Sequence, residues 1–81
     1  MRIVLSDRAV GSLGDAPVAV RKAFAKQLRF LVSNLHHPSI RAKKYDESND
    51  IWQGRVNRDW RFYFTITDDT YSIEDVIPHP K

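Results

Sequence analysis

Apolar residues recur at intervals of four and three positions in the first half of the chain. The repeat consists of Val20, Phe24, Leu28, Leu31 and Leu35. On a helix of 3.6 residues per turn these positions share one face, so the spacing predicts an amphipathic helix that runs to about Leu35. We expect Asp15 to cap this helix and Pro17 to lie in its first turn, where a missing N–H is tolerated.

The segment before this helix predicts a strand and a second, shorter helix. Residues 2–6 are apolar and β-branched, which is typical of a short strand. Ser6 or Asp7 can cap a helix that extends to about Leu13, and Gly14 is expected to end it.

The second half of the chain has the patterning of strands joined by short turns. Residues 38–50 are expected to form a loop, and three strands follow at about 51–57, 60–67 and 70–77. Because the links between the three strands are short, both pairs should be antiparallel hairpins. The first strand precedes two helices and cannot form a hairpin, so we expect it to join the sheet in parallel.

Alternation along the strands assigns the two faces of the predicted sheet. Trp60, Phe62, Phe64 and Ile66 share an apolar face that should pack on the helices. Arg55, Arg61 and Tyr63 would then stand together on the open face. The predicted fold is α+β, with two N-terminal helices packed on one face of a small, mostly antiparallel sheet in the order β-α-α-β-β-β. A chain of 81 residues is expected to form a single domain over residues 1–81.

Composition narrows the classes of function. The chain has no cysteine, which excludes disulfides and thiolate metal sites, and no convergent set of His and carboxylate ligands, so we expect neither a metal nor another cofactor. The net charge of +3 is compatible with a polyanionic partner. No segment approaches membrane-spanning length, and Asp7 stands where a signal peptide would be apolar, so a cytoplasmic location without a membrane partner is predicted.

Basic residues occur on the long predicted helix and among the strands. Arg21, Lys22, Lys26 and Arg29 lie off the apolar stripe and are interpreted as a solvated helix face. Arginines among aromatic residues in the predicted hairpin at 51–66 favour RNA as the polyanion, because arginine binds phosphate in a bidentate manner and aromatic rings stack on bases.

Three short segments carry a family resemblance. They are Trp52-Gln53-Gly54-Arg55-Val56, Trp60-Arg61-Phe62-Tyr63-Phe64 and Ile77-Pro78-His79-Pro80-Lys81. With the order of the predicted elements, they resemble the RelE/ParE superfamily of bacterial toxins from toxin–antitoxin systems. The resemblance extends over nearly the whole chain and is most specific over residues 38–81. It implies a metal-independent, ribosome-dependent mRNA endoribonuclease in which the RNA 2′-hydroxyl attacks the adjacent phosphate. The implied partners are mRNA in the ribosomal A site and a cognate antitoxin, which could form a hetero-oligomer with the toxin.

The resemblance also assigns roles to particular residues. Arg61 and Arg55 match phosphate-clamping positions, and His79 and Lys81 match the basic positions after the last strand. His79 is the expected acid or base because imidazole exchanges protons near neutral pH. The expected RNA-binding residues are Arg41, Lys43, Lys44, Gln53, Arg58 and Tyr63.

Two other functions stay open on the sequence. Gln53 stands where some nuclease members have a lysine, and the C-terminal tyrosine of those members has no counterpart here. The alternatives are a gyrase inhibitor of the ParE kind without nuclease activity, and a non-toxic relative that binds RNA or protein. A structural role for Arg61, in an ion pair with Asp59, Glu74 or Asp75, is the competing interpretation of that residue.

Overall fold

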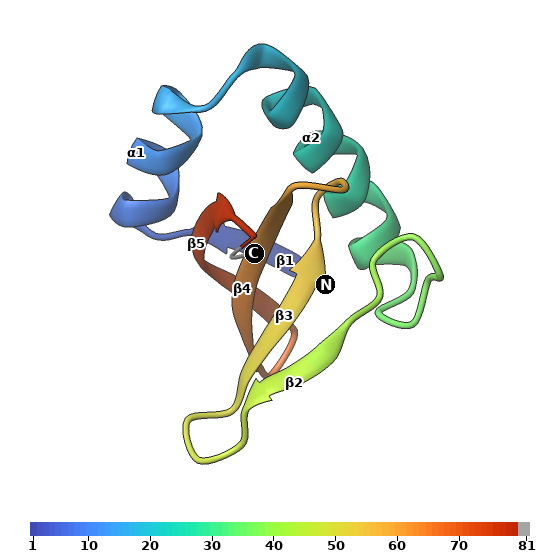
Figure 1. Cartoon of the computed structure of the whole chain (residues 1–81). Coiled ribbons are helices and arrows are strands. Elements are labelled where there is room, and N and C mark those ends of the chain that lie inside the picture. The colour runs from blue at the N-terminus through green and yellow to red at the C-terminus, as the bar shows by residue number, and fades with distance from the viewer. Residues whose placement is uncertain (80–81) are drawn as a thin grey trace.

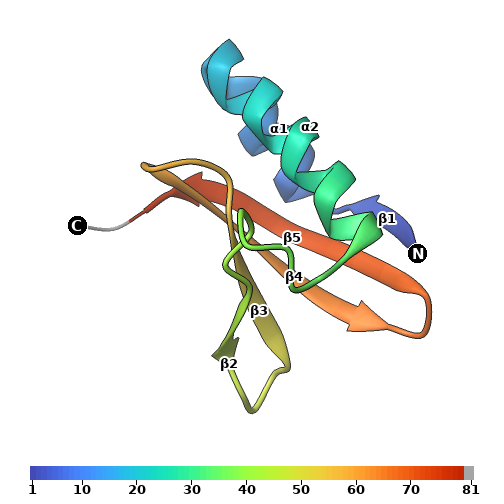
Figure 2. The same cartoon turned by 90° about the vertical axis from the view of Figure 1, so that its right-hand side faces the viewer.

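The computed structural model describes residues 1–79 and has two helices on one side of a twisted sheet (Figures 1 and 2). The elements are β1 (Arg2–Leu5), α1 (Asp7–Asp15), α2 (Val18–Ser33), β2 (Lys43–Asp46), β3 (Ile51–Arg55), β4 (Trp60–Thr67) and β5 (Thr70–Pro78). This arrangement confirms the predicted α+β fold with both helices on one face. Within residues 1–79, no helix is long and apolar enough to cross a membrane.

The sheet has the strand order β1-β5-β4-β3-β2. The pairs β3–β4 and β4–β5 are antiparallel, which confirms both predicted hairpins. β1 lies parallel to β5, with Arg2 opposite Thr70, as expected for a strand separated from its neighbour by helices. β4 and β3 therefore lie between other strands, and both present one face to the helices and one face away from them.

The core lies between the helices and β4. Phe62 and Phe64 are fully buried, and the ring of Phe24 on α2 meets that of Phe62 edge to face at 5.4 Å between centroids. Val20 and Leu31 of the predicted helical stripe are also buried, whereas Leu28 and Leu35 are half-buried. The alternation along β4 is thus confirmed: its aromatic face packs on the helices, and Arg61 points away from them.

The helix ends differ from those predicted. Ser6 caps α1 by accepting a hydrogen bond from Ala9 N–H at 3.0 Å. However, α1 continues through Gly14 to Asp15, so the predicted stop at Gly14 and the predicted capping of α2 by Asp15 are wrong. Pro17 precedes α2 and makes no side-chain cap, since the rigid ring alone sets the entry to the helix.

A strand that the sequence did not predict, β2, lies within the expected loop at 38–50. It is an edge strand of polar residues paired with β3 and interrupted by a bulge at Tyr45. Charged side chains are common on edge strands because they oppose unwanted pairing, and they also hide the strand from hydrophobic patterning.

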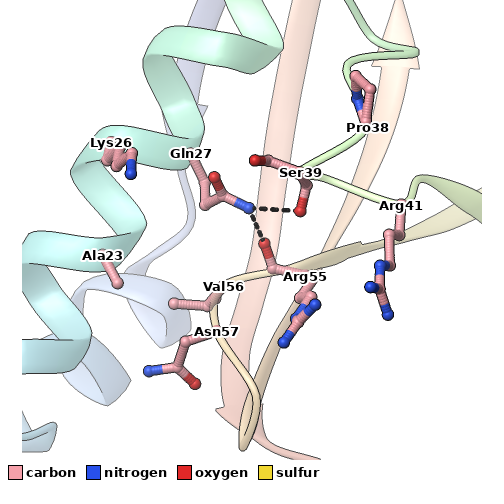
Figure 3. A pocket seen from close by; sticks show the side chains of 9 residues that line it. All are labelled: Ala23, Lys26, Gln27, Pro38, Ser39, Arg41, Arg55, Val56 and Asn57. Atoms are coloured by element: carbon pink, nitrogen blue, oxygen red, sulfur yellow. Dashed lines mark hydrogen bonds between the residues drawn. The ribbon is translucent and has the colours of Figure 1, made fainter.

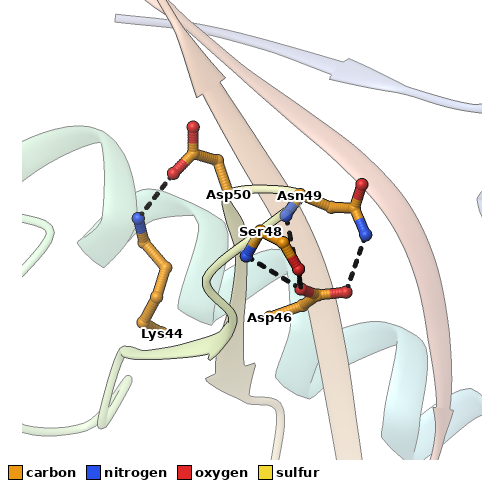
Figure 4. Close-up of polar contacts among 5 residues, drawn as sticks. All are labelled: Lys44, Asp46, Ser48, Asn49 and Asp50. Carbon is orange, nitrogen blue, oxygen red and sulfur yellow. Dashed lines mark hydrogen bonds and ion pairs between the residues drawn. The ribbon is translucent and has the colours of Figure 1, made fainter.

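The turn from β2 to β3 is closed by side chains (Figure 4). The Asp46 carboxylate accepts hydrogen bonds from the backbone N–H and side chain of both Ser48 and Asn49, and these bonds, those of the side chains above all, lower its pKa. Lys44 pairs with Asp50 at 2.9 Å and lies over the ring of Trp52. Polar contacts of the turn thus help to hold β2 beside β3, where apolar burial does not.

Gly54 on β3 provides the space that Phe62 occupies. A Cβ at this position would lie 2.6 Å from Phe62 Cε1, whereas a Cβ at Gly14 would meet nothing within 4 Å. Gly54→Ala should therefore lower the free energy of unfolding by about 1–3 kcal/mol through overpacking. Gly14→Ala, on an open helix surface, should raise it by about 0.5–1 kcal/mol. Urea denaturation of both variants measures the difference, and equal stability of the two would contradict the packing described here.

Candidate functional site

A cavity lined by basic residues opens on the face of the sheet that points away from the helices. It has a volume of about 310 Å³ and is lined by Arg41, Lys43, Gln53, Arg55, Arg61 and His79. We call it the cation cavity. Each of the six is a residue that the sequence singled out, although they come from positions as far apart as 41 and 79. Among the residues that the structure describes, no acidic side chain lines the cavity.

Two arginines face each other directly across β3 and β4. Arg55 and Arg61 are register partners, an arrangement in which like charges normally destabilise a sheet. Arg61 Nη1 donates to the carbonyl oxygens of Asn57 at 2.7 Å and Trp60 at 2.9 Å. Arg55 Nε is buried and has no hydrogen-bond partner. The sheet therefore holds two guanidinium groups together without neutralising them.

No carboxylate in the described part of the chain forms an ion pair with either arginine. The ion pair Lys44–Asp50 is the only one among residues 1–79, so Arg61 forms no ion pair with Asp59, Glu74 or Asp75 there. Burial, followed by the charges of Arg55 and Arg41, lowers the pKa of Arg61 below its usual value. An arginine still remains protonated under such conditions, and a bound anion would relieve the repulsion.

The loop before β2 brings Arg41 to the cavity. Arg41 has a φ of 49°, a left-handed conformation that costs energy for a residue with a side chain. The loop is fixed just before this turn. Arg55 N–H donates to Ile40 O at 2.7 Å, and the buried amide of Gln27 on α2 donates to Ser39 O at 2.9 Å and to Arg55 O at 2.6 Å (Figure 3).

Gln27 was missed by the sequence analysis, which assigned the neighbouring Leu28 to the buried stripe. Gln27 is buried, whereas Leu28 is only half-buried. A signal for this was present, because positions 20, 24, 27 and 31 also follow the spacing of four and three. A polar residue in such a series predicts a buried hydrogen-bonding role.

His79 reaches the cavity from the end of β5. Its backbone N–H donates to Asp59 O at 2.7 Å, which joins the segment after β5 to the turn between β3 and β4. Its side chain is exposed at the rim of the cavity and so is accessible to a ligand. Lys81, the other predicted basic residue of this segment, lies outside the described residues.

Three other predicted RNA-binding residues do not line the cavity. Lys44 is bound to Asp50 and lies on Trp52. Arg58 is exposed in the turn after β3, where its carbonyl accepts a long bond from Arg61. Tyr63 lies on the open face, as expected, but it is buried, with its hydroxyl accepting from Gln53 at 3.0 Å and its ring against Tyr45.

The arrangement can bind a phosphate group and supply a proton carrier beside it. Opposed guanidinium groups present several N–H donors to the oxygens of an anion, and a histidine at the rim can transfer protons. Among residues 1–79, no three His, Asp or Glu side chains lie close enough together to hold a metal ion.

The unpaired arginine should cost the protein stability. Arg55→Met keeps much of the side-chain volume but removes the unpartnered buried Nε and the repulsion with Arg61. We expect the free energy of unfolding to rise by about 1 kcal/mol, the scale of an unsatisfied buried donor. Arg58→Met, in the exposed turn, should change it by less than about 0.5 kcal/mol. Urea denaturation distinguishes the two, and a loss of stability confined to Arg55→Met would show that this guanidinium supports the fold.

Known structures share this architecture, although no family model and no curated protein sequence matches the chain. A YoeB/ParE toxin from Agrobacterium tumefaciens superposes with a TM-score of 0.82 at 9% identity, covering 99% of this chain and 100% of that one. RelE in the RelE–RelB complex from Pyrococcus horikoshii gives 0.79 at 18% identity, covering 95% and 92%. The YoeB dimer from Staphylococcus aureus gives 0.79 at 19% identity, covering 99% and 98%. The chain therefore has the fold of RelE/ParE-like toxins.

Proposed function

We propose that this chain is the toxin of a toxin–antitoxin pair and that it cleaves mRNA in the ribosomal A site without a metal ion. The observation that carries the proposal is the cation cavity, in which Arg55 and Arg61 oppose each other without an acidic partner and Arg55 Nε has no hydrogen bond. A cluster of this kind is costly to the folded protein and is explained by an anionic substrate. The likeness to toxin structures supports the toxin part of the proposal.

The proposed reaction is an attack of the RNA 2′-oxygen on the adjacent phosphorus. A new bond forms from phosphorus to the 2′-oxygen while the bond to the 5′-oxygen breaks, leaving a cyclic phosphate and a free 5′-hydroxyl. Arg55 and Arg61 stabilise the additional negative charge on the phosphate oxygens as it develops. Two protons move in this step, one from the 2′-hydroxyl and one to the departing 5′-oxygen. His79 at the rim transfers one of them, and water transfers the other. Lys43 and Arg41 hold the neighbouring backbone of the RNA.

A protein antitoxin is the proposed partner. Among structures similar to this chain are complexes of RelE with RelB and of YoeB with YefM. For this chain, an antitoxin with acidic side chains over the cation cavity would compensate Arg55 and Arg61 and exclude RNA from them. We place both the toxin and its antitoxin in the cytoplasm, where mRNA is translated.

Removal of the cavity arginines should abolish toxicity. Arg61→Ala is expected to relieve growth arrest on expression and to reduce cleavage of ribosome-bound mRNA by about 10²–10³-fold, the usual effect of losing one charge-stabilising donor. Arg61 also bonds to backbone carbonyls, so its variant requires a test of folding by circular dichroism. Arg55→Met, which we expect to fold with increased stability, provides the second test at the same site.

Arg58→Ala, outside the cavity, is the matched control and should remain toxic. Undiminished arrest by folded Arg61→Ala and Arg55→Met would contradict the assignment of the site. Mapping of mRNA ends in arrested cells tests the reaction itself: cuts positioned by codon support it, whereas intact mRNA with DNA damage would indicate gyrase inhibition instead.

A further inference from the structure

Two further pockets are candidate continuations of the cation cavity for a bound chain molecule. The first, which we call the helix-side pocket, has a volume of about 500 Å³ and is bounded by Ala23 and Lys26 of α2, by Arg41, and by Arg55, Val56 and Asn57 after β3 (Figure 3). The second, the tyrosine pocket, has a volume of about 270 Å³ and is bounded by Tyr45, Tyr63, Glu74 and Asp75. The helix-side pocket shares two lining residues with the cation cavity, whereas the tyrosine pocket shares none and is linked to it through the hydrogen bond of Gln53 to Tyr63.

The helix-side pocket is continuous with the cation cavity through two side chains. Arg41 and Arg55 line both spaces. The hydrogen bonds of Gln27 to Ser39 O and Arg55 O keep α2 at a fixed position beside these arginines. A strand that follows the two guanidinium groups therefore passes from one space directly into the other.

The groups around the helix-side pocket suit a nucleotide. Lys26 adds a third cation to Arg41 and Arg55, and no carboxylate lines this pocket. Ala23 and Val56 supply apolar surface, on which a base can lie. Asn57 Oδ1 accepts hydrogen bonds from the N–H groups of Asp59 and Trp60, which leaves the amide NH₂ as the group that can contact a ligand.

The tyrosine pocket has the opposite electrostatic character. Glu74 and Asp75 line it, and Arg8 is the single cation that residues 1–79 place there. The Asp75 carboxylate already accepts a hydrogen bond from Ser12 Oγ at 2.7 Å. Phosphates would be repelled by these carboxylates at short range. The tyrosine rings could stack on bases, but the charged phosphates between those bases would lie near the carboxylates. The tyrosine pocket is therefore unfavourable for RNA.

We propose that single-stranded RNA held at the cation cavity continues into the helix-side pocket, where Lys26 binds the phosphate next to the one that is cleaved. This inference rests on the proposed function, because it specifies the path of the same substrate. The sequence predicted that Lys26 lies on a solvated helix face without a binding role, whereas here it binds RNA. The proposal also gives the direction in which the RNA leaves the cation cavity.

A pair of charge reversals on α2 tests the path. Lys26→Glu and Lys22→Glu each change the net charge by the same amount, and Lys22 lies on the same helix but does not line the pocket. Binding of a 2′-O-methylated oligouridylate, which cannot be cleaved, is measured by fluorescence anisotropy over a range of salt concentrations. Lys26→Glu should weaken binding several-fold more than Lys22→Glu and reduce the salt dependence by about 0.7, the value for one phosphate contact on a single strand.

The outcomes separate this inference from the proposed function. If Lys26→Glu and Lys22→Glu weaken oligonucleotide binding equally while Arg61→Ala abolishes it, the proposed path is wrong. The cation cavity then remains the RNA site. Binding that is insensitive to Arg61→Ala would overturn both.

Cross-linking locates the strand directly. The same oligonucleotide with 4-thiouridine on each side of the central phosphate should cross-link to peptides of α2 and of the segment 38–41. Cross-links confined to Tyr45 or to β5 would place the RNA in the tyrosine pocket and contradict the proposal.

Discussion

The side chain of Gln27 joins the three parts of the molecule that create the cation cavity. Its amide donates to Ser39 O and Arg55 O, so one buried group on α2 fixes both the loop that carries Arg41 and the end of β3. The backbone bond from Arg55 N–H to Ile40 O completes the connection. Without these bonds, the buried Gln27 amide would have no acceptor and the left-handed turn at Arg41 would lose its support. The helix layer thus determines the shape of a site that opens on the opposite face of the sheet.

The sheet, and not any attraction between the charged groups, holds Arg55 and Arg61 in position. Arg55 and Arg61 repel each other and remain together because β3 and β4 are anchored by the aromatic packing of Phe62 and Phe64 on their other face. A hydrophobic face and a cationic face therefore share the same two strands, and the burial of the first offsets the electrostatic cost of the second. This arrangement preorganises the cations, since no rearrangement is needed when an anion binds.

Sequence patterning predicted the parts of this structure that depend on local periodicity. The alternation of apolar and polar residues in β4 correctly predicted which side chains face the helices. It therefore placed the buried phenylalanines on one face and Arg61 on the other. It could not give β2, because Lys43 and Lys44 form an edge strand through backbone pairing and turn contacts instead of apolar burial. Nor could it give the burial of Tyr63, whose ring is in contact with Tyr45 on that unpredicted strand. The convergence of Arg41 and His79 depends on the loop and on the register of β5, which are tertiary features.

The parallel pairing of β1 with β5 has a consequence for the order of folding. β1 is the first strand to be synthesised, yet its partner is the last strand of the described chain, and β5 also completes the pairing of β4. Such a distant contact forms late, because the intervening chain must first be brought together. His79 follows β5, so the proposed proton carrier joins the arginines only when this final strand is in place. Pairing of β5 with both β4 and β1 is therefore expected to be a condition for assembly of the complete cation cavity.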